Sequence, residues 1–388
     1  MSMRNTLQSP YSQWMDDDAP ETDVVISSRA RLARSLAGYP FPHRSSPEQA
    51  EQVIQAVNLA VRHAEFRARF GDAELTRMTE LSPVDRWILV EKHLISPGFL
   101  KNTESSFECK GLVLTPDERL SIMVNEEDHL RVQCLFPGLQ LEAAAGTADE
   151  ADSLLEKTLD FAFSDRIGYL TACPTNVGTG LRTSVMVHLP ALVLFGQVKE
   201  VLTTVSRLGL TVRGLFGEGT DAVGNLFQVS NQVTLGHRES EIIDNLASVT
   251  RHVIEQERSA RQQLVRQMPV VLRDRVGRAL GILKHAHTLG VEEAMRLISD
   301  VRLGVTAGLL KGPPSRVLLE LMVVTRPSYL VKTSGRELSP PQWDELRATL
   351  VRKLVNAHSG GDPEEGGSPE EGDSPEEGEK GEEGGQSP

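Results

Sequence analysis

The feature that most constrains this chain is a run of charged residues between two short apolar segments. Residues 125–131 read Asn-Glu-Glu-Asp-His-Leu-Arg, and Leu120–Val124 and Val132–Phe136 flank them. The flanks have the length and composition of strands, which predicts an antiparallel hairpin with the charged run at its turn. Hairpin turns favour Asn-Gly or Asp-Gly, and neither is present here. Adjacent acids repel one another, so concentrating them in a turn has an energetic cost. The run is therefore either a functional site that requires these charges or a charged surface turn.

Charge is distributed unevenly along the 388 residues, which carry a formal net charge of −13. Ser359–Pro388 contains eleven acids and one lysine, so it accounts for −10 of that charge. It repeats Pro-Glu-Glu-Gly three times and lacks apolar residues to bury, which predicts a disordered, solubilising tail at 358–388. The remaining body is close to neutral, a balance that does not favour nucleic acid as a direct partner.

Several protein classes are disfavoured by what the sequence lacks. The three cysteines form no Cys-x-x-Cys pair, which argues against a disulfide scaffold and a cysteine zinc site. Residues 1–22 read as a polar lead-in without the apolar core of a signal peptide. No apolar run approaches the roughly 18 residues of a membrane span. We therefore expect a cytoplasmic protein without membrane contact.

Arginines recur at the ends of predicted strands and loops. Arg29 and Arg31 alternate in an extended segment, so they share one face, where they could bind an oligophosphate or form a solvated strand end. A loop of small residues runs from Cys173 to Arg182, and it is neither a P-loop nor a dinucleotide fingerprint. Cys173 is either a buried small side chain or a reactive thiol beside arginines. A further strand carries Arg213 and leads into a glycine-rich loop with Glu218.

Helical patterns occur along the whole chain and are most frequent in its second half. Ser46 and Gln49 predict a capping box, as do Thr147 and Glu150, each before an apolar helical face. Residues 190–208 and 239–266 read as helices, and amphipathic segments follow at 291–303, at 316–325 and from Ser339. We therefore predict an α+β domain at 23–262 and an all-helical C-terminal domain at 263–357.

The scattered arginines and two separate carboxylates suggest one chemistry. Five arginines in a chain without a P-loop suggest that side chains, rather than a backbone loop, bind a triphosphate. Such a set could catalyse phosphoryl transfer, which depends mostly on positioning and charge stabilisation. The carboxylates of Glu127 and Glu218 suit a cationic acceptor that must lose a proton. A guanidinium group fits that description.

Three motifs resemble those of the phosphagen (guanidino) kinases: residues 27–31, 125–131 and 173–182. The resemblance extends over roughly residues 24–260 and implies an antiparallel sheet flanked by helices. It also implies that ATP is the phosphoryl donor and that Mg²⁺ rides mainly on its phosphates. Glu127 would be the catalytic base, Glu218 the second guanidinium-binding carboxylate, and Cys173 a neighbour of the guanidinium. The implied nucleotide-binding residues are Ser28, Arg29, Arg31, His93, Arg131, Arg182 and Arg213.

Only 26 residues precede Ser27, whereas small-substrate phosphagen kinases have about a hundred residues of helical domain before this stretch. After the kinase-like part, about 95 further residues, 263–357, come before the acidic tail. Both features are similar to the bacterial protein-arginine kinases of the McsB type, as are residues 90–97 and 299–304. This resemblance implies ATP-dependent phosphorylation of arginine side chains in proteins, which marks them for degradation in the stress response. It also implies a homodimer, a zinc-binding activator protein, a transcriptional repressor as substrate, and a Clp protease.

Two other functions remain open. A kinase of free arginine would phosphorylate the small molecule, and a phosphoarginine-binding adaptor would bind proteins without using ATP. One motif also departs from the protein-arginine kinase pattern. Their phosphoarginine-sensing motif reads Arg-Asp-x-x-Arg-Ala, and here Trp343 occupies the first position of the match ending at Arg347-Ala348.

Overall fold

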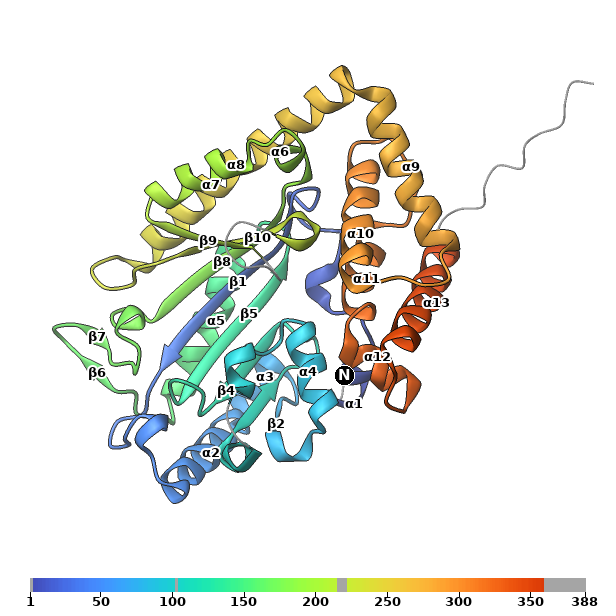
Figure 1. Ribbon diagram of the computed structural model, residues 1–388. Coiled ribbons are helices and arrows are strands. Elements are labelled where there is room, and N and C mark those ends of the chain that lie inside the picture. Colours follow the sequence, from blue (N-terminus) through green and yellow to red (C-terminus); the bar gives the residue numbers. More distant parts are fainter. Residues whose placement is uncertain (1–2, 102–103, 215–221, 359–388) are drawn as a thin grey trace, which may run out of the picture.

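An eight-stranded antiparallel sheet forms the centre of the protein, with strand order β2-β3-β4-β5-β1-β8-β10-β9 (Figure 1). The computed structural model describes residues 3–101, 104–214 and 222–358, with no side-chain detail at 104–106. Glu218 and the predicted acidic tail therefore lie outside the described residues. The strands of the main sheet are β1 (Val25–Arg34), β2 (Glu74–Arg77), β3 (Gly111–Leu114), β4 (Leu120–Val124), β5 (Leu130–Pro137), β8 (Leu181–His188), β9 (Leu210–Gly214) and β10 (Leu226–Asn231); β6 (Phe163–Ser164) and β7 (Gly168–Tyr169) pair separately.

Helices cover one face of this sheet, and the apolar side chains of the strands explain why. Ala30 and Leu32 of β1 point to that face and are almost completely buried. The helices that pack against it include α5 and α8, behind β1, β5 and β8 (Figure 1). The helices of the first 267 residues are α1 (Met3–Gln8), α2 (Pro47–Val61), α3 (Ala64–Phe70), α4 (Pro83–Glu91), α5 (Leu141–Glu156), α6 (Pro190–Leu194), α7 (Val198–Arg207) and α8 (Glu239–Gln267).

The C-terminal part is helical, as predicted, and its helices pack beside one another at one side of the sheet (Figure 1). The predicted boundary at 262/263 falls inside α8. None of the described helices is long and apolar enough to cross a membrane. The helices are α9 (Pro269–His285), α10 (Val291–Thr306), α11 (Ser315–Val324), α12 (Pro327–Ser334) and α13 (Pro340–His358).

The local predictions differ in outcome. The charged run does join two paired strands, β4 and β5, and Ser46 and Gln49 do form a capping box on α2. The capping box predicted at Thr147 is wrong, because α5 already begins at Leu141 and includes that residue. The single helix predicted at 190–208 is also wrong. It is divided into α6 and α7 at Gly196, whose φ of 69° does not belong to a right-handed helix.

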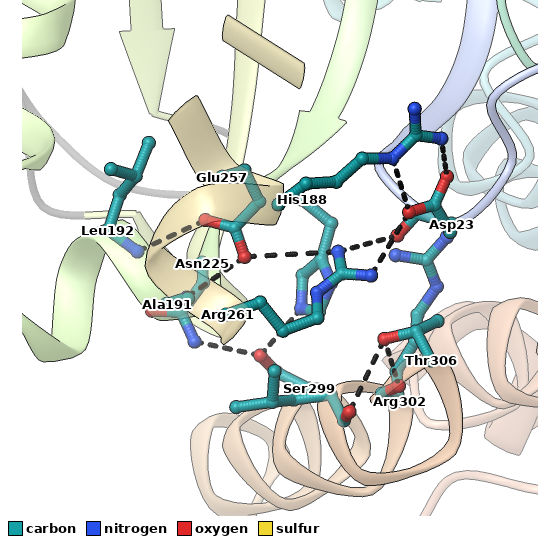
Figure 2. Close-up of polar contacts among 12 residues, drawn as sticks. Asp23, His188, Ala191, Leu192, Asn225, Glu257, Arg261, Ser299, Arg302 and Thr306 are labelled. Atoms are coloured by element: carbon teal, nitrogen blue, oxygen red, sulfur yellow. Dashed lines mark hydrogen bonds and ion pairs between the residues drawn. The ribbon is translucent and has the colours of Figure 1, made fainter. Parts of the chain in front are cut away.

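A polar seam joins the helical part to the sheet, and the segment 299–304 of α10 supplies much of it (Figure 2). The hydroxyl of Ser299 contacts His188 Nε2 at 2.8 Å and accepts a hydrogen bond of 2.7 Å from Asn225 Nδ2. Arg302 donates to the carbonyl oxygen of Thr22 at 2.5 Å, shortly before β1 begins. The seam therefore connects α10 to the ends of the strands that carry the predicted site.

A second contact between the two parts predicts a pH effect on stability. Glu91, the last residue of α4, accepts a hydrogen bond of 3.3 Å from the Ser328 amide of α12. Burial raises its pKa from 4.5 to about 7. The folded state therefore binds a proton that the unfolded state releases, so this residue lowers stability as pH rises from about 4.5 to 7.

We expect Glu91→Gln to stabilise the protein progressively over that pH range, by at most about 3 kcal/mol above pH 7. Urea unfolding of both proteins at pH 5 and pH 8 measures the difference. Glu80→Gln, at an exposed glutamate, is the matched control and should show no such trend. An equal effect of Glu91→Gln at both pH values would contradict the assignment.

Candidate functional site

Four strands bring the predicted arginines to the sheet face opposite α5. Arg31 lies directly opposite Arg182 of β8 and opposite Gln133 of β5. Arg131 is two residues from Gln133, so strand alternation puts it on the same face. Arg213 of β9 pairs with Gln228, which continues this face through Met186 to Ser27. The register therefore gathers five arginines that are far apart in the sequence.

These guanidinium groups repel one another, and the face is poor in compensating acids. Burial, followed by the charges of Arg131 and Arg182, lowers the pKa of Arg29 to about 10. Burial, followed by the charges of Arg29, Arg131 and Arg182, lowers the pKa of Arg31 well below its ordinary value. The Nε atoms of Arg31 and Arg182 are buried and have no hydrogen-bond partner among the described residues. Such a cluster is suited to a polyanion that brings both charge and acceptor oxygens.

The turn after β4 contains two kinds of residue: some hold the turn in place, and others face the arginines. The side-chain amide of Asn125 donates to the carbonyl oxygens of Ala50 and Cys109, and Asn125 itself has a φ of 60°. The Asp128 carboxylate accepts from the Ala172 amide at 2.6 Å and from the Ser35 hydroxyl at 3.0 Å. The turn is thus fixed to α2, to the end of β1 and to the Cys173 loop.

His129 is also structural. Its Nδ1 accepts the Leu36 amide at 3.0 Å, so its Nε2 must carry the proton that bonds to the Pro40 carbonyl. Burial lowers the pKa of this imidazole, consistent with the neutral form. The charged residues of the run that remain are Glu126, Glu127 and Arg131.

Arg131 is held by both glutamates of the turn. Its Nη1 lies 2.6 Å from Glu126 Oε2, and its Nη2 lies 3.2 Å from Glu127 Oε2. Glu126 is nearly buried and also accepts the Ser96 hydroxyl, whereas the Glu127 side chain is 45% exposed. Glu127 is therefore the carboxylate that an incoming ligand can reach, and Glu126 is the one that orients Arg131.

Cys173 lies close enough to Arg182 to act on its charge. Its Sγ is 3.0 Å from the Thr175 hydroxyl, and the next residues form a short 3₁₀ turn. Burial and Arg213 lower the pKa of Arg182, while Cys173 and Glu127 act in the opposite direction. The hydroxyl of Thr234 donates to the Val177 carbonyl at 2.7 Å and so supports the cysteine loop.

A small recess at the other end of the face contains Arg29 and His93. Burial and, to a smaller extent, the charges of Arg29 and Arg326 lower the pKa of His93 to about 3. Its imidazole is therefore neutral at physiological pH. Ser28 does not reach this recess. Its hydroxyl donates to the Gly138 carbonyl and accepts the Gln140 amide on the opposite face. The recess is lined by Ser27, Arg29, His93, Leu135, Ser184, Met186 and Gln228.

Sequence reasoning therefore selected Ser28 where the geometry favours Ser27. Strand alternation could have identified Ser27, because it shares the face of Arg29 and Arg31. The sequence around Gln228 has no pattern that would have predicted its place in the recess. Among the described residues, no group of three or more His, Cys, Asp and Glu could hold a metal ion.

The Trp343 segment lies in the helical part. Arg347 is buried and donates to the carbonyl oxygens of Leu289 at 2.6 Å and Thr325 at 2.8 Å, and it pairs with Asp344. The indole nitrogen of Trp343 is buried without a hydrogen-bond partner among the described residues. In this structure, the arginine of the motif thus stabilises contacts between helices.

Two family models match the chain: the catalytic domain of ATP:guanido phosphotransferases at residues 52–260, and the C-terminal domain of the protein-arginine kinase McsB at 269–365. The protein-arginine kinase of Desulforamulus reducens is 54% identical, over 92% of this chain and 99% of its own length. That of Bacillus subtilis is 45% identical, over 94% and 99% respectively.

Solved structures show the same fold at lower identity. The crystal structure of lombricine kinase has a TM-score of 0.52 and 24% identity, and the match covers 66% of this chain and 75% of that one. The substrate-free duplicated taurocyamine kinase from Schistosoma mansoni has a TM-score of 0.53 and 21% identity, with coverage of 86% and 51%. These two likenesses support the sheet architecture alone.

Proposed function

This chain belongs to the protein-arginine kinase family, and we propose from that premise how its residues transfer phosphate from ATP to arginine side chains of proteins. The observation that carries the proposal is the arginine cluster on the open sheet face, beside a reachable carboxylate. Arg29, Arg31, Arg131, Arg182 and Arg213 bind the phosphates of ATP, whose charge relieves their mutual repulsion. His93 and Ser27, rather than Ser28, complete the nucleotide site.

Glu127 acts as the general base. A guanidinium has a pKa above about 12, so its attacking nitrogen must lose a proton. That nitrogen forms a bond to the γ-phosphorus as the bond to the β,γ-bridging oxygen breaks, and ADP leaves. The proton passes to Glu127. ATP draws Arg131 toward its phosphates while Glu126 retains hold of Arg131, which frees Glu127 for the substrate.

Other members of the site assist this step. Glu218, whose position lies outside the described residues, is the second carboxylate for the guanidinium. Cys173 adjusts the charge around it from its place near Arg182 and Glu127. As the resemblance to guanidino kinases implies, Mg²⁺ would be held mainly by the phosphates of ATP, where it would neutralise their charge, and no step here depends on it.

The family also suggests a cellular context. We propose a cytoplasmic homodimer assembled through the helical part at 263–357. Its partners are a zinc-binding activator protein, a transcriptional repressor as substrate, and a Clp protease that degrades the marked proteins in stress.

Phosphorus NMR tests the proposed reaction. The protein is mixed with Mg-ATP, free L-arginine and an arginine-rich protein, and we expect an acid-labile P–N signal on the protein alone. A signal on free arginine would show a small-molecule kinase instead. No signal on either acceptor, also after addition of a family activator, would favour the non-catalytic adaptor and contradict the proposal.

A further inference from the structure

Residues 3–15 pack against the core rather than forming a loose lead-in. Leu7, Trp14 and Met15 are buried with side chains of α4 and the C-terminal helices. Lys92 anchors the segment, because its fully buried Nζ donates to the carbonyl oxygens of Thr6 at 2.9 Å and Ser9 at 3.2 Å. A buried ammonium group requires such partners. The segment is therefore fixed at the residue that precedes His93.

Glu118 completes this anchor. One of its oxygens pairs with Lys92 Nζ at 2.9 Å, and the other accepts the Ser12 hydroxyl. Burial lowers the pKa of Lys92, and Glu118 opposes that effect. Breaking a buried pair of this kind by removing one partner is strongly destabilising, so the segment has a defined position against the catalytic part.

Trp14 is the residue of this segment that contacts His93, which lines the recess. Its indole N–H donates to the carbonyl oxygen of Lys92 at 3.0 Å, which belongs to the peptide group that enters His93. Its ring meets the imidazole of His93 edge to face, with centroids 5.5 Å apart and an interplanar angle of 63°. Trp14 thus contacts both the backbone and the side chain that define where the imidazole lies.

His93 needs such support because its backbone is strained. Its φ of 61° lies in the left-handed region, which non-glycine residues rarely adopt and only where the surroundings impose it. From the other side, Gln133 Nε2 donates to the carbonyl oxygen of His93 at 3.0 Å. His93 is therefore held by Trp14, which contacts its ring, and by Gln133 of β5, which binds its backbone, and it lines the recess that also contains Arg29.

We propose that Trp14 is a positioning residue of the nucleotide site, which holds His93 in its place against ATP. The inference rests on the proposed function, because it assumes that ATP occupies the recess of Arg29 and His93. It gives the N-terminal segment a role in nucleotide affinity, distinct from the arginines that hold the phosphates and from Glu127.

The same segment also contacts the helical C-terminal part. The Arg316 amide of α11 donates to Asp17 at 3.0 Å, and the Arg316 guanidinium lies 5.1 Å from the ring centre of Tyr11. Tyr329 of α12 donates to the carbonyl oxygen of Gln8 at 3.3 Å. The segment lies between the C-terminal helices and His93, so a merely structural role is the alternative to be tested.

The first test is Trp14→Phe in the full-length protein, with Trp87→Phe as the matched control. Trp87 lies on α4 and its side chain is half exposed. Loss of one hydrogen bond and part of the ring contact should raise the KM for ATP roughly three- to tenfold. We expect the KM for the protein substrate and kcat to stay within about twofold. A lowered Tm with an unchanged KM for ATP would show packing alone and overturn the proposal.

Fluorine NMR of protein labelled with 5-fluorotryptophan gives a second test that leaves Trp14 in place. The chain has three tryptophans, and the Trp14 resonance is the one that remains in both Trp87→Phe and Trp343→Phe. We expect ATP to shift this resonance and to leave that of Trp87 unchanged. An unshifted Trp14 resonance at saturating ATP would contradict the proposal.

Arg29→Ala separates the inference from the proposed function. If Arg29→Ala abolishes ATP binding while Trp14→Phe leaves it unchanged, the positioning role is wrong and the nucleotide site stands. If Arg29→Ala binds ATP like the parent protein, the nucleotide site itself is misassigned.

Discussion

Glu127→Ala is expected to lower arginine phosphorylation by about 10²- to 10⁴-fold, the range that a positioned general base contributes. The affinity for ATP should remain within about threefold, because Glu127 contacts Arg131 at 3.2 Å and acts on Arg182 through its charge alone. Arg131 keeps its 2.6 Å contact with Glu126 in the variant. Transfer of radiolabel from γ-labelled ATP measures turnover, and calorimetric titration measures ATP affinity.

The matched control is Glu142→Ala, at an exposed glutamate of α5 behind the sheet, which should behave like the parent protein. Turnover of Glu127→Ala close to the parent value would remove Glu127 from the role of base. Loss of ATP binding in the same variant would instead show that Glu127 is needed to orient Arg131.

Two arginines of the same strand should respond to substitution in opposite ways. Arg31 faces other guanidinium groups, which lower its pKa together with burial, and its Nε has no partner among the described residues. Arg31→Met should therefore stabilise the ligand-free protein, on the order of 1 kcal/mol, by removing this repulsion. The same change should reduce turnover by at least about 10²-fold, because the phosphates lose a charged donor.

Arg34, three residues further along β1, is the contrasting case. It is buried, contacts Asp152 at 2.7 Å and lies 3.5 Å from the ring centre of Tyr169. Arg34→Met leaves a buried carboxylate without its partner, which should destabilise the protein by about 3–5 kcal/mol. Denaturant unfolding of both variants, with and without ATP, checks the pair. Destabilisation of the ligand-free protein by Arg31→Met would show that the cluster is already neutralised.

The alternation of arginines was the part of the site that the sequence predicted by simple geometry. Period-two spacing puts Arg29 and Arg31 on one face, and β1 confirms this. Arg131 and Arg182 lie on that face because β5 and β8 pair with β1. A local sequence pattern does not predict this strand order. The expectation that these arginines act together came from the resemblance to guanidino kinases.

Short sequence motifs gave wrong predictions where residues outside the motif determined the local structure. The Thr147 pattern is a valid four-residue cap signal, but α5 had already begun at Leu141 and runs through it. The contacts of residues 3–15 could not be predicted from the sequence either. Trp14 and Lys92 lie 78 residues apart, and only the folded chain shows that they meet.

The placement of the N-terminal segment has a consequence for the order in which the chain can fold on the ribosome. Gln8 contacts Tyr329, 321 positions later, and Arg29 contacts Ser184, 155 positions later. Contacts between such distant positions form slowly, and synthesis delivers the N-terminal partner first. The segment's contacts with Lys92 and Glu118 join positions that are synthesised early, whereas its contacts with α11 and α12 require the C-terminal helices. We therefore expect the segment to take up its position beside His93 first and to join the helical part only when translation is almost over.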